Sequence, residues 1–132
     1  MQIHHVAIAV ESLDAALAFY RDALGAHVGA RHEVPAEGVE VAFLPMGDSE
    51  LELLQPLDPG NAIGRFLERH GEGIHHICLL VADIEGSVKR LENEGARMAT
   101  EIRRHADGTR YAFVHPKSAH GVLMELYEKP QR

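Results

Sequence analysis

Apolar and polar side chains alternate along residues 3–10, which read I-H-H-V-A-I-A-V. A period of two predicts a strand whose side chains point in turn to two different faces. The pattern returns at residues 74–81 as I-H-H-I-C-L-L-V, at an offset of 74 − 3 = 71 residues, with four of the eight positions identical. The chain therefore contains an internal repeat, and we expect its two copies to fold alike.

A helix is predicted after the first strand of each copy, over about 13–24 and about 84–94. Apolar residues recur there with the spacing of a helix that buries one side. A side-chain oxygen suited to accept first-turn N–H groups precedes each helix, and a glycine suited to a left-handed turn follows it. These residues are Ser12 and Asp83 before the helices, and Gly25 and Gly95 after them.

Three further β segments follow the helix in each copy, at about 27–34, 38–45 and 50–55, and at about 98–103, 110–115 and 121–127. Gly47 and Asp48 predict a hairpin, and the connection 56–73 is expected to contain a short helix near 61–70. The order βαβββ, present twice, predicts an α+β fold. Two tandem modules would form a curved, partly open eight-stranded sheet around a metal-binding cleft. We expect a single domain over residues 1–132, made of repeats at about 1–57 and 73–128.

Composition and charge exclude several classes of function. The 132 residues carry a formal net charge of −7 without a clustered Lys/Arg stretch, which argues against nucleic acid as a partner. No apolar run reaches the 18 residues of a membrane span. The single cysteine, Cys78, excludes an internal disulfide, and the N-terminus shows no signal or transit pattern. The sequence therefore predicts a cytoplasmic protein.

Strand alternation places one histidine of each pair on a face with small or modest side chains. His5 shares its face with two alanines, whereas His4 lies on the bulkier face that should pack on the helix. His76 stands at the equivalent position of the second copy, so His5 and His76 are expected to point toward a common cleft. His4 and His75 are expected to serve packing or supporting roles.

Two glutamates interrupt apolar strands, again one in each copy. Glu52 lies within L-E-L-L and Glu125 within V-L-M-E-L. A carboxylate among apolar residues is costly to bury unless it is paired, protonated or bound to a metal. A single His or Glu in a strand is ordinarily a packing or surface residue, but recurrence in both repeats favours a shared site. Two imidazoles and two carboxylates suit a divalent ion such as Co, Mn, Ni, Zn or Fe, with coordination positions left open for substrate.

Five stretches carry a resemblance to known proteins. They read I-H-H-V-A-I-A-V at 3–10, E-G-V-E-V-A-F-L-P at 37–45, L-E-L-L-Q-P-L at 51–57, G-I-H-H-I at 73–77, and H-P-K-S followed by G-V-L-M-E-L at 115–126. They resemble the vicinal oxygen chelate superfamily and, more closely, its methylmalonyl-CoA epimerase family. The resemblance covers nearly the whole chain.

The resemblance implies a homodimeric enzyme that interconverts (R)- and (S)-methylmalonyl-CoA, an acyl-CoA thioester, by proton transfer at the α carbon. It implies cobalt, with manganese, nickel or zinc as alternatives. It implies one set of metal ligands, made of His5, Glu52, His76 and Glu125.

The catalytic pair is also suggested by the resemblance. Glu40 aligns with a catalytic base, and we expect Glu40 and Glu125 to act on opposite faces of the substrate. Lys117 and Ser118 are candidate contacts for the CoA phosphates or the substrate carboxylate. The loop E-I-R-R-H-A-D-G-T-R at 101–110 departs from the family pattern, which leaves the contacts to the CoA tail open.

Three other activities remain compatible with this sequence. A glyoxalase-type isomerase or lyase uses the same ligand set and a related enediolate. An extradiol dioxygenase uses two histidines and one carboxylate on iron, so a second carboxylate counts against it. A small-molecule-binding module on the same fold need not keep the metal ligands. The segment at 115–126 favours the epimerase.

Overall fold

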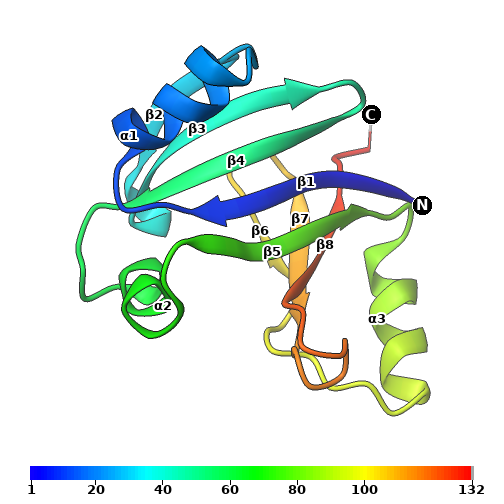
Figure 1. The fold of residues 1–132 in the computed structure, drawn as a ribbon. Coiled ribbons are helices and arrows are strands. Elements are labelled where there is room, and N and C mark those ends of the chain that lie inside the picture. The colour runs from blue at the N-terminus through cyan, green and yellow to red at the C-terminus, as the bar shows by residue number, and fades with distance from the viewer. Residues whose placement is uncertain (132) are drawn as a thin grey trace. The chain divides into compact units, whose positions relative to one another are not determined.

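The computed structural model describes residues 1–131 of the chain. Contacts between residues divide it into two compact units. The N-terminal unit comprises His5–His75, and the C-terminal unit comprises Met1–His4 together with the residues from His76 onward. Figure 1 labels the elements of both units. Each unit is described by itself.

The N-terminal unit contains strands in the order β2-β3-β4-β1. These are β1 (Gln2–Ala9), β2 (Ala30–Val34), β3 (Val39–Met46) and β4 (Ser49–Pro56). Strands β1 and β4 run parallel, and the other neighbours are antiparallel. Met46 pairs with Ser49, so the turn between β3 and β4 holds only Gly47, with φ 65°, and Asp48. The expected hairpin is confirmed.

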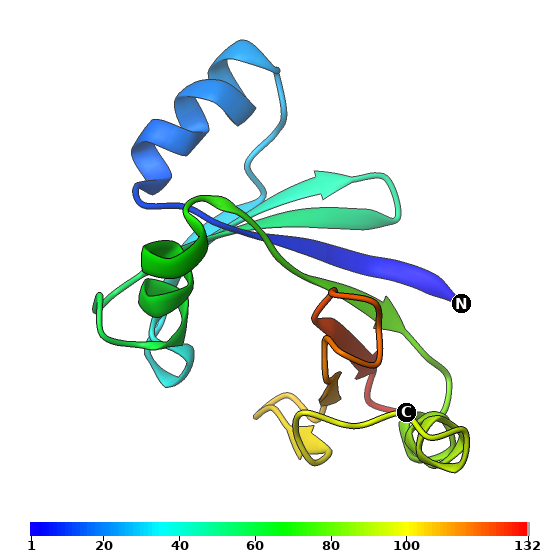
Figure 2. The same cartoon turned by 60° about the horizontal axis from the view of Figure 1, so that its bottom comes forward.

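Helices cover both faces of this sheet (Figure 2). On one face, α1 (Leu13–Leu17) and the π-helical segment η1 (Ala18–Ala23) follow Ser12, whose Oγ accepts the Ala15 N–H at 3.2 Å. Leu13 and Leu17 pack there against Leu53. On the other face, α2 (Ala62–His70) buries Ile63 and Leu67. A single 3-10 turn, η2 (Pro35–Glu37), connects β2 and β3.

The C-terminal unit repeats the plan with strands in the order β5-β8-β7-β6. These are β5 (Gly73–Leu80), β6 (Arg103–Arg104), β7 (Arg110–Val114) and β8 (Met124–Glu128). Strands β5 and β8 are parallel, and the other pairs are antiparallel. Helix α3 (Ile84–Asn93) begins at Asp83, whose carboxylate accepts the Gly86 N–H at 3.1 Å. Ile84 packs with Ala112 and Leu126 on one face of the sheet.

The expected α+β class with eight strands is confirmed, and both helix caps are as predicted. Four boundaries differ from the expectation, and the first is that the strand expected at 27–34 begins only at Ala30. The helix expected at 13–24 changes to π-helical geometry from Ala18. Strand β6 shrinks to two residues because the Thr100 side chain takes the Phe113 N–H at 3.0 Å in place of a regular ladder. Strand β8 begins only at Met124, after a turn in which His120 and Gly121 have φ of 57° and 95°.

Across residues 1–131, no helix is long and apolar enough to cross a bilayer.

Candidate functional site

A buried histidine–glutamate pair lies on one face of the N-terminal sheet. His5 Nδ1 and Glu52 Oε2 are 3.0 Å apart, with side chains only 5% and 15% exposed. The two residues come from the parallel neighbours β1 and β4, in which Ala7 stands in register with Glu52. Ala7 leaves room beside the pair because its side chain is a single methyl group. The alternation expected from the sequence therefore places His5 and Glu52 together.

A second pair of the same composition lies in the C-terminal sheet. His76 Nε2 and Glu125 Oε1 are 3.3 Å apart, and their side chains are 10% and 7% exposed. They come from the parallel neighbours β5 and β8, with Cys78 in register with Glu125. Each unit thus builds its pair from a histidine in its first strand and a glutamate in its last. In both units the residue two positions after the histidine is in register with the glutamate.

Both pairs offer the donors that divalent metals use. An imidazole nitrogen and a carboxylate are present in each, and the histidines and glutamates are among the side chains able to hold a metal ion. A carboxylate held in such a dry position is costly unless a positive charge or a proton accompanies it. The chemistry of the donors therefore fits a cation.

Glu40 does not lie on the face that carries His5 and Glu52. In the β3–β4 register Glu52 is opposite Phe43, whereas Glu40 is opposite Gln55. The Gln55 side chain reaches the start of α1, where its Oε1 accepts the Leu13 N–H at 2.8 Å. Glu40 therefore points to the α1 side of the sheet.

The carboxylate of Glu40 is also already engaged. Its Oε2 lies 3.2 Å from Arg31 Nε, and Arg31 Nη1 lies 2.7 Å from Asp14 Oδ1 in the first turn of α1. The hydrogen bond to Asp14, and then that to Glu40, raises the pKa of the Arg31 guanidinium. The resemblance implied that Glu40 acts as a base together with Glu125, whereas its position on the α1 side and its ion pair with Arg31 favour a structural role.

The similarity of the chain to known proteins agrees with this geometry. The Glyoxalase/Bleomycin resistance protein/Dioxygenase superfamily profile matches residues 4–113. The chain belongs to this superfamily. An ethylmalonyl-CoA/methylmalonyl-CoA epimerase of Cereibacter sphaeroides is 45% identical over 128 residues, 95% of this chain and 96% of the relative. The human mitochondrial methylmalonyl-CoA epimerase is 40% identical over 127 residues, 95% of this chain and 72% of the relative.

A solved structure gives the same result at the level of the fold. A variant of Streptomyces coelicolor methylmalonyl-CoA epimerase in complex with 2-nitronate-propionyl-CoA superposes with a TM-score of 0.86 at 36% identity, over 99% of each chain. The resemblance indicated by the sequence motifs is therefore confirmed.

Lys117 and Ser118, the two candidate contacts for the substrate, differ in whether their side chains are free to reach a ligand. Ser118 Oγ accepts the Arg97 N–H at 2.8 Å, so its hydroxyl holds the loop between β7 and β8 to the segment before β6. Lys117 donates its backbone N–H to His115 Nδ1 at 3.1 Å, and its side chain is exposed. Lys117 can therefore reach a ligand, whereas Ser118 is part of the loop's own framework.

Arg110 lies on the α3 side of the C-terminal sheet. Its guanidinium is paired there with two carboxylates, so it is not available to CoA phosphates. Its Nη2 lies 2.7 Å from Glu128 Oε1, and its Nη1 lies 2.5 Å from Glu85 Oε1. Glu128 also accepts the Ile84 N–H at 2.8 Å. That backbone hydrogen bond, followed by the one from Arg110, lowers the pKa of the Glu128 carboxyl. No local sequence pattern predicts this role of Glu128; the one signal is its position three residues after Glu125, which matches that of Gln55 after Glu52.

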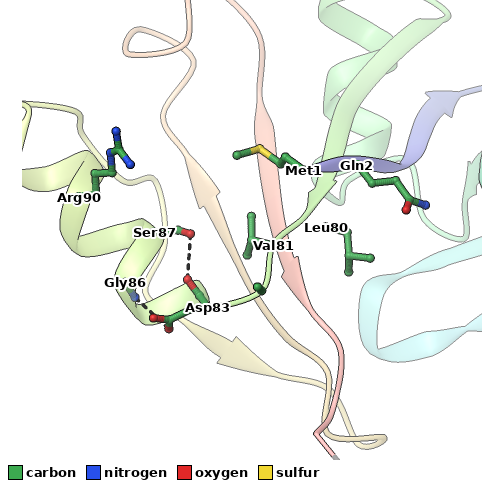
Figure 3. Close-up of a pocket in the computed structure, with 9 residues that line it drawn as sticks. Met1, Gln2, Leu80, Val81, Asp83, Gly86, Ser87 and Arg90 are labelled. Carbon is green, nitrogen blue, oxygen red and sulfur yellow. Dashed lines mark hydrogen bonds between the residues drawn. The ribbon is translucent and has the colours of Figure 1, made fainter.

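A pocket of about 750 Å3 opens at the start of α3 in the C-terminal unit (Figure 3). Its wall includes Leu80, Val81, Ser87 and Arg90, and it contains neither His76 nor Glu125. The Asp83 carboxylate already caps the helix N-terminus there. A second anion is therefore disfavoured at this position.

Proposed function

We propose that this chain is a methylmalonyl-CoA epimerase, which interconverts the (R) and (S) thioesters by moving the proton on the α carbon. One observation carries the proposal. The same buried His–Glu pair recurs at equivalent positions of both units, in a chain whose relatives bear that name. The repeated pair is chemistry that a packing role alone does not require.

The metal centre is part of the proposal. His5, Glu52, His76 and Glu125 would together hold one divalent ion, and we propose cobalt as the physiological metal. The donor set supports this, because it mixes imidazole nitrogen with carboxylate oxygen and lacks the thiolates that favour softer ions. When bound, such an ion supplies positive charge that lowers the free energy needed to remove the α proton.

The proton transfers belong to the protein's own carboxylates. Epimerisation removes a proton from one face of the α carbon and returns a proton to the other face. Glu125 is the first candidate, as the sequence indicated. Because Glu40 is held on the α1 side by Arg31, we assign the second transfer to Glu52, which is equivalent to Glu125 in the internal repeat. The low exposure of both glutamate side chains, 15% for Glu52 and 7% for Glu125, limits competition by water.

The proposal also includes the setting in which the protein works. We propose a homodimer in the cytoplasm, since the buried thiol of Cys78 suits a reducing compartment. Sedimentation of the purified chain tests the dimer: a species of twice the chain mass supports it, and a monomer at assay concentrations contradicts it.

Exchange of the α proton tests the function directly. Protein loaded with Co2+ is incubated with (S)-methylmalonyl-CoA in D2O, and deuterium uptake is followed by mass spectrometry alongside the stereochemistry of the thioester. Uptake with loss of stereochemical purity is the expected result. Protein that holds cobalt but gives no uptake would contradict the proposal. In that case turnover of a hemithioacetal would indicate the glyoxalase-type activity, and absence of any turnover would indicate a binding module.

A further inference from the structure

An aromatic ring stands directly beside the catalytic pair of the C-terminal unit. Phe113 on β7 is in register with Glu125 on β8. Its ring centroid lies 5.4 Å from that of His76, with an interplanar angle of 87°, so the two rings meet edge to face. Phe113 is half-buried. The ring therefore lies next to both donors of the C-terminal pair.

The N-terminal unit has a phenylalanine in the same position, but with different surroundings. Phe43 is in register with Glu52. It packs against a buried cluster that α2 closes with Ile63 and Leu67. In the described part of the C-terminal unit the helix is α3, which lies on the opposite face of the sheet from Glu125. Both rings are partly buried, but Phe43 packs against the cluster that α2 closes, whereas no helix of the described C-terminal unit covers the face that carries Phe113.

Further aromatic side chains extend this surface away from Glu125. Tyr111 follows Phe113 on the same face of β7, with ring centroids 6.4 Å apart and an edge-to-face angle of 85°. His105 stacks on Tyr111 with centroids 4.1 Å apart and planes 13° from parallel. Phe113, Tyr111 and His105 thus form a continuous row of aromatic rings, in which Phe113 offers an apolar surface next to the pair.

We propose that Phe113 determines which alkyl group is accepted on the α carbon of the substrate. This inference rests on the proposed epimerase function. The substrate's thioester and carboxylate groups are polar and are held at the metal centre, so its α-alkyl group is the part left to contact an apolar ring. We therefore expect a methyl group to be accepted beside the ring and longer alkyl groups to be disfavoured by contact with it. Each extra methylene in a closely fitted apolar site changes kcat/KM by roughly tenfold or more.

The test compares methylmalonyl-CoA with propylmalonyl-CoA as competing substrates for exchange in D2O. The ratio of their kcat/KM values does not depend on how much of a preparation is active. Phe113→Ala is expected to raise the propyl-to-methyl ratio at least about tenfold. Phe113→Leu should raise it by a smaller factor, because Leu fills more of the space. Phe43→Leu is the matched control, and it should leave the ratio within about twofold of the original protein because its ring packs against the cluster that α2 closes.

The outcomes separate this inference from the function on which it rests. No exchange by the unmodified protein with either thioester overturns the proposed function and the inference together. Exchange by the unmodified protein, with a ratio unchanged in both Phe113 variants, overturns the inference alone. An equal change in Phe43→Leu and Phe113→Leu also overturns it, since a general loosening of the sheet would then explain the effect. Circular dichroism and Co2+ titration establish that each variant is folded and holds metal.

Discussion

Glu128 Oε2 accepts the backbone N–H of Ile84 at 2.8 Å, across 44 residues of sequence. Glu128 lies three residues after Glu125 and on the opposite face of β8. Gln55 does the same for Leu13, also at 2.8 Å, three residues after Glu52. The last strand of each unit therefore holds the first turn of its helix on one face and presents a site glutamate on the other. Helix position and site geometry are coupled through one short strand.

The first prediction concerns the contribution of Glu128 to stability and its sensitivity to acid. Glu128→Gln keeps an oxygen for the Ile84 N–H, as Gln55 does, but it loses the ion pair with Arg110. We expect the free energy of unfolding at pH 7 to fall by about 1.5–3 kcal/mol, the range for a hydrogen bond to a charged group. Urea denaturation at pH 7 measures this difference.

The pH dependence follows from the direction of the shift. The pKa of Glu128 is lower in the folded protein than its ordinary value of 4.5. Its contribution is therefore complete above that ordinary value and is lost as the pH falls through the lower pKa of the folded state. The gap between the original protein and Glu128→Gln should shrink on acidification. Glu101→Gln, at an exposed carboxylate, serves as control. A gap that stays constant down to pH 3 would contradict the assignment.

The second prediction concerns Glu40. Because its carboxylate lies on the α1 side, Glu40→Gln should leave proton exchange and Co2+ affinity within about twofold of the original protein. It should reduce stability by about 0–1 kcal/mol, since its partner Arg31 is one-third exposed and such pairs contribute little. Exchange kinetics and urea denaturation provide the two measurements. A loss of exchange by a factor of about 100, typical of a missing acid–base group, would return Glu40 to the site.

The sequence was sufficient to locate both His–Glu pairs. Strand alternation and the 71-residue repeat put His5 and His76 at equivalent positions, and the interrupted apolar strands pointed to the glutamates. The face of the sheet that carries Glu40 was not predicted, because alternation within one strand does not say which faces of two strands coincide. The two-residue turn at Gly47–Asp48 sets the register between β3 and β4 and so determines which faces of the two strands coincide. It pairs residues whose numbers sum to 95, since Met46 pairs with Ser49, and so sets Glu40 against Gln55.

Other features depend on contacts that no local pattern contains. The shortening of β6 results from the Thr100 side chain, which takes a hydrogen bond that a strand partner would otherwise receive. The different surroundings of Phe43 and Phe113 arise because α2 has no counterpart on the matching face of the other unit's described residues. Repeat alignment predicts that the two rings are equivalent, and only tertiary packing distinguishes them.

The third prediction concerns the histidines. His5→Gln and His76→Gln should each weaken Co2+ binding by more than about 100-fold, since even the loss of a group that only supports a ligand costs 10–100-fold. Titration of the apoprotein followed by visible absorption measures the affinity without reference to activity. His32→Gln, at an exposed histidine, is the control. If either site variant keeps the original affinity, that histidine is not a ligand.

The last prediction separates the two glutamates. Glu52→Gln and Glu125→Gln each keep an oxygen donor for the metal but remove a group that can accept a proton. If each glutamate serves one face of the α carbon, each variant should still exchange the α proton of one epimer with D2O. That exchange should leave the configuration unchanged, because the proton returns from the side on which it left. Epimerisation itself should fall by about 100-fold or more in both variants.

The two variants should retain opposite epimers, and this complementarity is the decisive readout. It is measured by offering pure (R)- and pure (S)-methylmalonyl-CoA separately and following deuterium uptake and configuration by chiral analysis. A general loss of metal or of folding would reduce exchange of both epimers equally, so it cannot imitate the pattern. Retention of the same epimer by both variants would contradict the assignment of one face to each glutamate. Full epimerisation by Glu52→Gln would show that the second proton comes from a residue other than Glu52, with Glu125 still tested by its own variant.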